Sequence, residues 1–142
     1  IADRLLQKRE KIRLLALVDT LEYLKKGGRI SATTAVVGGL LNIKPAISVV
    51  DGVVETVGKA RGAKAANTLL RQLIEKDGGI DETMPLCFAW SGSSDENLKK
   101  FMDENGDLWA ASGENLSVSS VGCVIGAHVG PGAVAVAFFG KE

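Results

Sequence analysis

The sequence predicts an α/β fold of the mixed α+β kind, in which packed helices and one mixed β-sheet form a two-layer sandwich. Two observations carry this prediction. Asp51-Gly52 separates two alternating apolar stretches, which is typical of an antiparallel β-hairpin. Short apolar runs at 86–90 and 133–139 alternate with helix-like segments. The length of 142 residues fits one hydrophobic core, so we treat residues 1–142 as a single domain.

Three short elements are expected before the hairpin. Residues 1–13 place apolar side chains on neighbouring helical turns, and the run 14–18 is apolar throughout, as in a buried strand. A helix is expected over 21–26, where Gly27-Gly28 ends it. Ser31 then has the side chain of an N-cap, which predicts a second short helix after it.

The two-residue turn sets the register of the hairpin. Asp51-Gly52 tolerates the positive φ angles of a type I′ turn, so Val50 is expected to pair with Val53. Counting outward places apolar side chains on one face and polar ones on the other. The same count places Lys44 opposite Lys59. We expect this repulsive pair to be relieved by solvent, a neighbouring acid or an anionic partner, and we favour solvent because the pair should be exposed and screened.

The rest of the chain alternates between helices and strands. Residues 61–76 are rich in helix formers, and Ser93 and Glu96 have the spacing of a capping box that opens a helix to about residue 104. His128 is expected in the connection before the last strand. The expected strands are 86–90, 107–112, 116–121 and 133–139.

Charge and hydropathy exclude several classes of protein. The chain has 17 basic and 17 acidic residues, so no net field gathers nucleic acid. The longest apolar region, 121–139, is interrupted by His128 and by a Gly-Pro-Gly turn, and we predict no transmembrane segment. Cys87 and Cys123 lie inside separate apolar runs and are predicted to be buried, reduced thiols of a cytoplasmic protein.

The segment Gly27-Gly28-Arg29-Ile30-Ser31 is the first candidate site. Two glycines let the backbone turn sharply and approach another group closely. The guanidinium of Arg29 suits a carboxylate or phosphate because it donates two parallel hydrogen bonds, and Ser31 adds a hydroxyl. The spacing alone also fits a helix-terminating turn followed by a solvated arginine.

The second candidate is His128, the single histidine of the chain, within Gly126-Ala127-His128-Val129-Gly130-Pro131-Gly132. Glycine on both sides leaves the imidazole open to approach, and Pro-Gly fixes the following turn. The ring can donate a hydrogen bond to a carboxylate. A lone histidine among apolar residues also fits a core group that is satisfied internally.

Catalytic and metal-binding patterns are incomplete. No nucleophile elbow surrounds Ser91 or Ser93, and no second histidine is available for a metal. The Gly126-x-x-x-Gly130 spacing lacks the Lys and Ser/Thr of a phosphate-binding loop. We therefore expect no catalytic residue, no metal, no cofactor and no enzymatic activity.

Four blocks, taken in order, resemble the DegV family of bacterial fatty-acid-binding proteins. The match covers essentially the whole chain but only the C-terminal portion of such proteins. The sequence also begins at Ile1 without Met or a secretory leader, so we interpret it as a fragment whose N-terminal domain is absent. The blocks are Leu21-Glu22-Tyr23-Leu24-Lys25-Lys26-Gly27-Gly28-Arg29-Ile30-Ser31, Leu41-Asn42-Ile43-Lys44-Pro45, Asp51-Gly52 and Gly126-Ala127-His128-Val129-Gly130-Pro131-Gly132.

The resemblance implies a carrier that holds a long-chain fatty acid between two domains and presents its carboxylate to a fatty-acid kinase. In the family, hydroxyl groups of the N-terminal domain touch the carboxylate, so that domain is an implied partner. Arg29 and His128 are similar to residues that support the head-group network. The residues expected at the ligand are Arg29, His128, Ser31, Gly28, Gly130, Ile30 and Ile43, and the candidates for the tunnel wall are Ile30, Leu41, Ile43 and Phe138.

The energetics of such a carrier are consistent with this composition. Burying about fourteen methylenes at roughly 0.8 kcal/mol each supplies about 11 kcal/mol. Removing an ionised carboxylate from water opposes binding unless hydrogen-bond donors receive it.

Two other functions stay open on the residues alone. A docking domain without its own ligand would use Lys44, Lys59 and Arg61 to meet an acidic partner. An enzyme acting on an acyl or phosphorylated substrate would use His128 as general base and Arg29 to hold the anion.

Overall fold

The computed structural model describes residues 2–31 and 42–141. Short 3₁₀ turns cover Arg9–Lys11, Gly106–Leu108 and Gly113–Asn115. The helices and strands are α1 (Ala2–Lys8), β1 (Ile12–Leu17), α2 (Glu22–Lys26), β2 (Ile43–Val50), β3 (Val53–Arg61), α3 (Ala63–Lys76), β4 (Leu86–Trp90), α4 (Glu96–Glu104), β5 (Leu116–Ser120), α5 (Cys123–Val129) and β6 (Val134–Phe139).

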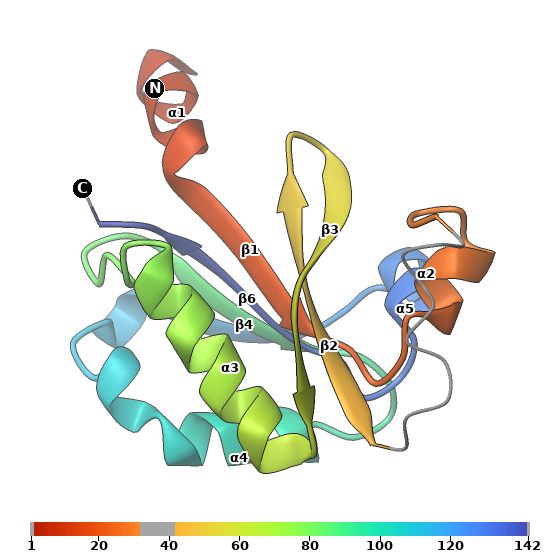
Figure 1. The fold of residues 1–142 in the computed structure, drawn as a ribbon. Coiled ribbons are helices and arrows are strands. Elements are labelled where there is room, and N and C mark those ends of the chain that lie inside the picture. The colour runs from red at the N-terminus through yellow and green to blue at the C-terminus, as the bar shows by residue number, and fades with distance from the viewer. Residues whose placement is uncertain (1, 32–41, 142) are drawn as a thin grey trace.

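The described strands form one sheet in the order β3-β2-β1-β6-β4-β5 (Figure 1). β4 and β5 run parallel, while the other neighbouring pairs are antiparallel. The last strand in sequence, β6, lies between β1 and β4 near the middle of the sheet. The predicted fold class, helices packed on a mixed sheet that contains a hairpin, is confirmed.

The hairpin turn has the predicted geometry. Asp51 and Gly52 have φ angles of 50° and 80°, and a type I′ turn requires a positive φ at both positions. Val50 pairs with Val53, as counting outward from the turn predicts.

The register beyond the middle of the hairpin differs from the prediction. Ile47 pairs with Thr56 but Ala46 pairs with Gly58, so the β3 strand carries one extra residue, a β-bulge. The bulge moves Lys59 opposite Pro45, and the predicted pairing of Lys44 with Lys59 is wrong.

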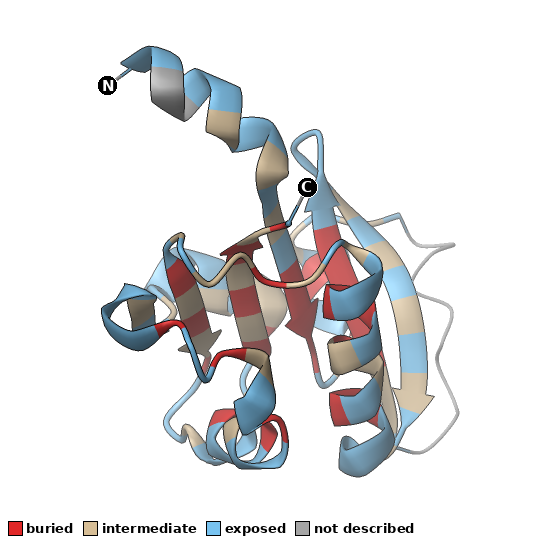
Figure 2. Cartoon of the chain, turned by 90° about the vertical axis from the view of Figure 1, so that its left-hand side faces the viewer, coloured by how far each residue is buried: buried red, intermediate tan, exposed pale blue. Residues whose placement is uncertain are grey.

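One face of the sheet is covered by α3 and α4, and the main core lies between these layers (Figure 2). Large side chains fill this core, including an aromatic cluster of Phe88, Phe101 and Trp109. Its two closest rings, those of Phe88 and Trp109, lie with centroids 4.8 Å apart in an edge-to-face arrangement, which favours aromatic pairs. We call this side the covered face.

The other side of the sheet carries a smaller apolar cluster under α2 and α5. Ala16 and Val18 of the β1 segment belong to this cluster, whereas Leu15 and Leu17 belong to the main core. Because successive strand side chains point to opposite faces, the two clusters lie on opposite sides of the sheet. We call this second side the open face, and α2 and α5 lie together at one end of it (Figure 1).

Several local predictions are wrong. The first helix ends at Lys8 and β1 begins at Ile12, where a helix was expected to continue. Residues 107–112 form turns in place of a strand, because Trp109 packs into the aromatic cluster and Ser112 closes a turn onto Trp109 O.

The expected capping box is absent as well. The N-cap of α4 is Asp95, and the amide of Glu96 donates to Ser94 Oγ at 3.3 Å. His128 lies in the connection between β5 and β6, as expected, and that connection contains the short helix α5, whose last turn carries His128. The short helix predicted after Ser31 falls outside the described residues.

The two cysteines are free, but the prediction that both are buried is wrong. Cys87 is half-buried and Cys123 is exposed at the start of α5. No described helix has the length and hydropathy needed to cross a membrane.

Candidate functional site

An apolar cavity of about 300 Å³ opens on the open face, between the sheet and the α2–α5 pair. Most of its lining is aliphatic, and small side chains of the central strands form its floor. Arg29 and His128, far apart in sequence, both line it. The lining residues are Leu14, Ala16, Leu24, Arg29, Ile47, Ser48, Val49, Val54, Ala89, Val121, Ile125, His128, Val129, Ala133 and Ala135.

The turn after α2 places Arg29 at this cavity. The amide of Arg29 donates to Leu24 O at 2.8 Å, which brings the chain back across the end of the helix. The guanidinium then donates from Nη1 to Gly27 O at 3.1 Å. Arg29 is exposed, so its remaining N–H groups are available to a ligand at the mouth of the cavity.

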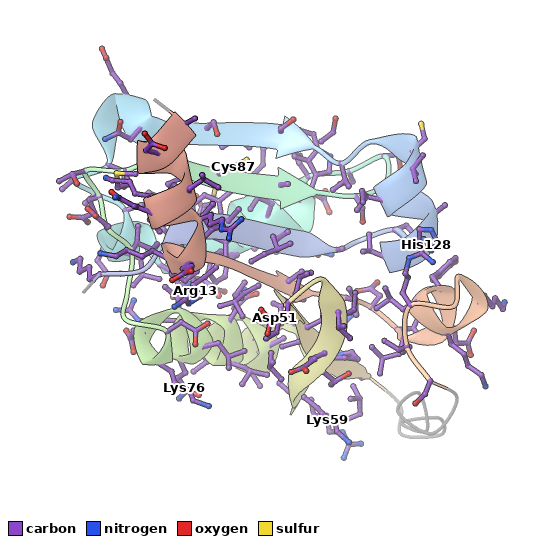
Figure 3. The ribbon with its side chains drawn as sticks, turned by 90° about the horizontal axis from the view of Figure 1, so that it is seen from above. Arg13, Asp51, Lys59, Lys76, Cys87 and His128 are labelled. Carbon is purple, nitrogen blue, oxygen red and sulfur yellow. The ribbon has the colours of Figure 1, made fainter. Side chains whose placement is uncertain are left out.

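The ring of His128 packs directly on Gly27 at the end of α2. Figure 3 shows the side chain of His128 on the side of α5 that faces α2. A Cβ atom on Gly27 would overlap the Nδ1 atom of His128, so only glycine leaves room for the ring there. Nδ1 is buried and has no hydrogen-bond partner among the described residues. The close approach expected of the two glycines is therefore an approach of Gly27 to His128.

A second glycine contact joins the same two helices. Gly130 follows α5, and a Cβ atom at this position would overlap the aromatic ring of Tyr23 on α2. The two contacts, Gly27 with His128 and Gly130 with Tyr23, interlock the ends of α2 and α5. They explain why the two sequence motifs occur in one chain.

The remaining predicted ligand residues do not line this cavity. Ile30 is half-buried and packs on the open-face cluster, whereas Gly28 and Ser31 are exposed. Gly130 is buried against Tyr23, and Ile43 is half-buried at the start of β2.

Phe138 and Leu41 are the other two tunnel-wall candidates. Phe138 is 1% exposed and belongs to the main core on the covered face, so its interpretation as a wall of this cavity is wrong. Leu41 lies outside the described residues.

Sequence reasoning missed most of the cavity floor. Ala16, Ala89, Ala133 and Ala135 line the cavity, and all of them lie in or beside central strands. The missed signal is the alternation of alanine with large residues in the stretch Ala133–Phe139. Such a strand places small side chains on one face of the sheet and large ones on the other, which predicts a cavity on the face with the small side chains.

No acidic side chain is among the described residues that line this cavity. A general base at His128 would therefore find no orienting carboxylate within that described lining. Within the described residues there is also no cluster of three or more His, Cys, Asp or Glu side chains suited to a metal ion.

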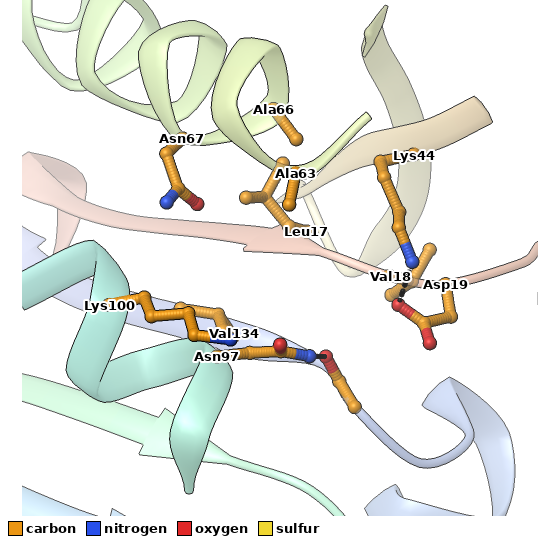
Figure 4. Close-up of a pocket in the computed structure, with 11 residues that line it drawn as sticks. Leu17, Val18, Asp19, Lys44, Ala63, Ala66, Asn67, Asn97, Lys100 and Val134 are labelled. Carbon is orange, nitrogen blue, oxygen red and sulfur yellow. Dashed lines mark hydrogen bonds and ion pairs between the residues drawn. The ribbon is translucent and has the colours of Figure 1, made fainter. Parts of the chain in front are cut away.

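A smaller cavity of about 60 Å³, lined by both apolar and polar side chains, lies on the covered face (Figure 4). Lys44 donates to Asp19 across its edge, with Nζ and Oδ1 2.6 Å apart. Lys44 is thus paired within the chain. It lies opposite Ala60 in the hairpin, so its side chain points to the other face of the sheet from those of Lys59 and Arg61. The structure does not join the three cations of the docking hypothesis into one surface.

Comparison with known proteins gives consistent matches. The family model described as "Uncharacterised protein, DegV family" matches residues 1–141. A DegV domain-containing protein of Caldanaerobacter subterraneus is 36% identical over 135 residues, which cover 90% of this chain and 45% of the relative. A solved structure concerned with fatty-acid binding of a DegV family protein from Thermus thermophilus has a TM-score of 0.80 and 31% identity, over 99% of this chain and 49% of that one.

The fold also matches more distant structures. The fatty acid kinase B3 protein of Streptococcus pneumoniae, loaded with linoleic acid, has a TM-score of 0.84 at 18% identity, over 99% of this chain and 48% of that one. At this identity the likeness concerns the fold alone. The chain spans about half the length of the relatives that it matches. Since the family model matches residues 1–141 and the fold agrees with solved members, this chain belongs to the DegV family.

Proposed function

We propose that this protein binds a long-chain fatty acid as a carrier and does not transform it. The acyl chain lies in the cavity of the open face, and the carboxylate lies at Arg29 and His128. One observation carries the proposal: the two polar residues of the two motifs line the same apolar cavity.

The chemistry of the lining supports a ligand that is apolar along its length and polar at one end. Among the described lining residues only Arg29, Ser48 and His128 have polar side chains. Ser48 Oγ already donates to Leu14 O at 3.0 Å, which leaves Arg29 and His128 for the ligand. The cavity volume of about 300 Å³ is at the lower end of small-molecule sites.

The charge at the mouth of the cavity supports an anionic head group. Arg29 lies just beyond the last turn of α2, which carries Lys25 and Lys26, and all three side chains are exposed. A guanidinium receives a carboxylate through two parallel hydrogen bonds, which offsets the loss of hydration of the anion.

The position of His128 supports a second contact with the same head group. Its Nδ1 atom is buried against Gly27, so Nε2 is the ring nitrogen left to donate to a ligand. The Gly27 contact fixes the ring and limits the entropy lost on binding.

The Thermus thermophilus relative supports the ligand class, because its structure concerns fatty-acid binding and it is 31% identical to this chain. Presentation of the bound carboxylate to a kinase is the further step we propose. In that step the kinase transfers the γ-phosphoryl group of ATP to a carboxylate oxygen and releases ADP.

The test compares palmitate with hexadecanol, which has the same chain length but no carboxylate. The full-length product of the gene is delipidated, and displacement of a fluorescent fatty acid gives both affinities. Palmitate should bind at least about tenfold more tightly than hexadecanol if the head-group contacts contribute about 1.4 kcal/mol. Failure of the delipidated wild-type protein to bind palmitate would overturn the proposal.

Variants assign the head-group contacts. Arg29→Gln and His128→Ala should each lower palmitate affinity about tenfold and leave hexadecanol affinity within about threefold. Lys26→Gln is the matched control, since it removes an exposed cation from α2 that does not line the cavity. An equal loss in Lys26→Gln and Arg29→Gln would show a diffuse charge effect and would contradict the assigned site.

A further inference from the structure

Ser91, directly after β4, makes an unusual number of contacts with one loop. Its amide donates to Ala133 O at 3.2 Å, and its carbonyl accepts from the amide of Gly132 at 2.9 Å. Its hydroxyl donates to Gly130 O and accepts from the amide of Ala133 at 3.0 Å. These four bonds, which we call the Ser91 clamp, close the loop between α5 and β6.

We infer that Ser91 is a positioning residue that holds His128 at the head-group site. The ligand-binding part of this inference rests on the proposed function; the placement of the His128 ring does not. Ser91 does not line the cavity, so it acts only through the chain that it clamps.

The segment that carries His128 needs such anchors. α5 has seven residues, and an isolated helix of this length is unstable in water. The amide of Val121, before α5, donates to Trp90 O at 2.8 Å, while the Ser91 clamp holds the chain after α5. Both ends of the α5 segment are therefore fixed to the adjacent residues Trp90 and Ser91.

The hydroxyl of Ser91 is the part of the clamp that a mutation can remove. Ser91 is 1% exposed, so water cannot replace its bonds to Gly130 and Ala133 without opening the structure. An alanine would leave a buried carbonyl and a buried amide without partners, which is unfavourable.

The clamp is linked to His128 through the last turn of α5. The amide of Gly130 donates to Gly126 O at 2.9 Å, which closes the turn that contains His128. Because the hydroxyl of Ser91 holds the carbonyl of the same Gly130, its loss should release this turn. The ring of His128 would then move away from Gly27 and from Arg29.

The first experiment measures the ring in the ligand-free, full-length product of the gene by NMR. In the wild-type protein we expect a nuclear Overhauser effect between the Cε1 proton of His128 and the α protons of Gly27, since these groups are in contact. Ser91→Ala should abolish this effect and shift the ring signals, and Ser91→Thr, which keeps the hydroxyl, should restore both. An unchanged ring signal and unchanged contact in Ser91→Ala would overturn the inference.

Ser117→Ala is the control for loss of a serine hydroxyl that bonds to the backbone. The hydroxyl of Ser117, an exposed residue, donates to Leu86 O at 3.2 Å at the opposite end of β4. This variant should leave the His128 signals unchanged. If it shifts them as much as Ser91→Ala does, the effect is a general loss of stability and the inference is wrong.

The second experiment measures head-group selectivity, which a merely structural residue would not alter. Ser91→Ala should lower the ratio of palmitate to hexadecanol affinity about tenfold, with Ser91→Thr close to wild type. Wild-type protein that binds no palmitate would refute the proposed function, while the NMR measurement would still decide the role of Ser91. An unchanged ratio in a variant with a displaced ring would refute the ligand-binding part of the inference.

Asn97→Ala provides a second route if Ser91→Ala does not fold. Asn97 is an exposed residue of α4, and its Nδ2 atom donates to Gly132 O at 3.1 Å, in the loop that Ser91 clamps. A further variant, Ser91→Cys, weakens the hydroxyl bonds without adding a methyl group. Asn97→Ala should shift the NMR signals of the His128 ring in the same direction as Ser91→Cys but by a smaller amount. Ring signals identical to wild type in both variants would contradict the inference.

Discussion

The covered and open faces of the sheet are built from the same strands but from side chains of different size. In β6, Val134, Val136 and Phe138 point to the covered face, whereas Ala135 points into the cavity of the open face. β4 repeats this pattern with Phe88 in the main core and Ala89 in the cavity. One alternation thus produces a filled core and a hollow.

This difference indicates that the side chains of the covered face stabilise the fold, whereas the proposed ligand binding depends on side chains of the open face. On the covered face, Phe88 and Phe101 are 0% exposed and are surrounded by other large side chains. On the open face, Val49 and Ile125 line the cavity and remain 42% and 57% exposed. Apolar surface of this kind marks a binding site more often than a structural requirement.

The largest expected effect is a loss of stability when a core side chain of the covered face is removed. Phe101→Ala should lower the free energy of unfolding by about 3–5 kcal/mol, because it leaves a cavity beside Phe88 and Trp109. Ile125→Ala, on the open face, should cost less than about 1 kcal/mol but weaken palmitate binding. Urea denaturation and the displacement assay measure the two quantities. Similar losses of stability in both variants would show that the open face contributes to stability as much as the covered face does.

The next largest expected effect is a loss of palmitate affinity when a larger side chain fills the cavity of the open face. Ala135→Leu should weaken palmitate binding about fiftyfold, because the added carbons displace about three methylenes at roughly 0.8 kcal/mol each. Ala137→Leu is the control, since Ala137 lies two residues further along β6 and does not line the cavity. Affinity in Ala137→Leu should stay within about threefold of wild type. An equal loss in both variants would place the acyl chain elsewhere on the open face.

A smaller effect concerns the head group alone. Gly27→Ala should displace the His128 ring and lower palmitate affinity about tenfold, with little change for hexadecanol. Gly28→Ala should affect stability and not the ring. A Cβ atom at Gly28 would contact no other atom, but the φ angle of +68° is strained for alanine. This substitution should cost about 1 kcal/mol in stability and leave selectivity unchanged. A loss of selectivity for palmitate over hexadecanol in Gly28→Ala but not in Gly27→Ala would contradict the assigned contact between Gly27 and the His128 ring.

The smallest effect lies on the helical side of the covered face and depends on pH. Hydrogen bonds from Arg71, at 2.8 and 2.7 Å, lower the pKa of Asp107 from its usual 3.8. A carboxylate with a lowered folded-state pKa stabilises the protein above its unfolded pKa and loses this contribution as the pH falls through the folded value. Asp107→Asn should therefore lower Tm by about a degree at pH 7, since the pair is exposed, and the difference from wild type should shrink as the pH falls below the usual carboxyl pKa of 3.8. Palmitate affinity should not change.

The fold was predictable to the extent that local signals were strong. The Asp51-Gly52 turn, the strand over 86–90 and the helix before Gly27 follow from turn chemistry and apolar runs. The bulge that shifts Lys59 was missed, although Gly58, which directly follows the extra residue in β3, is a residue type that often marks a β-bulge inside a strand. The turns at 107–112 were misassigned because a tertiary contact, the packing of Trp109 on Phe88, overrides the strand propensity of that stretch.

The candidate site was only partly predictable. Arg29 was found because it follows two glycines, and His128 because glycines flank its segment, but their shared cavity depends on the packing of α2 on α5. Leu24 and Val121 also line the cavity, yet in the sequence they resemble any core residue. The alternation of alanine with large side chains in β4 and β6 indicated the cavity, but the sequence motifs did not include these alanines.

The most direct test of the central claim locates palmitate on the protein. Uniformly ¹³C-labelled palmitate bound to the full-length product of the gene gives isotope-filtered nuclear Overhauser effects between ligand and side chains. We predict contacts from the acyl chain to Leu14, Ala135 and Ile125, and from the protons next to the carboxylate to His128. Contacts confined to the side chains of α3 and α4, or a carboxylate end remote from His128, would contradict it.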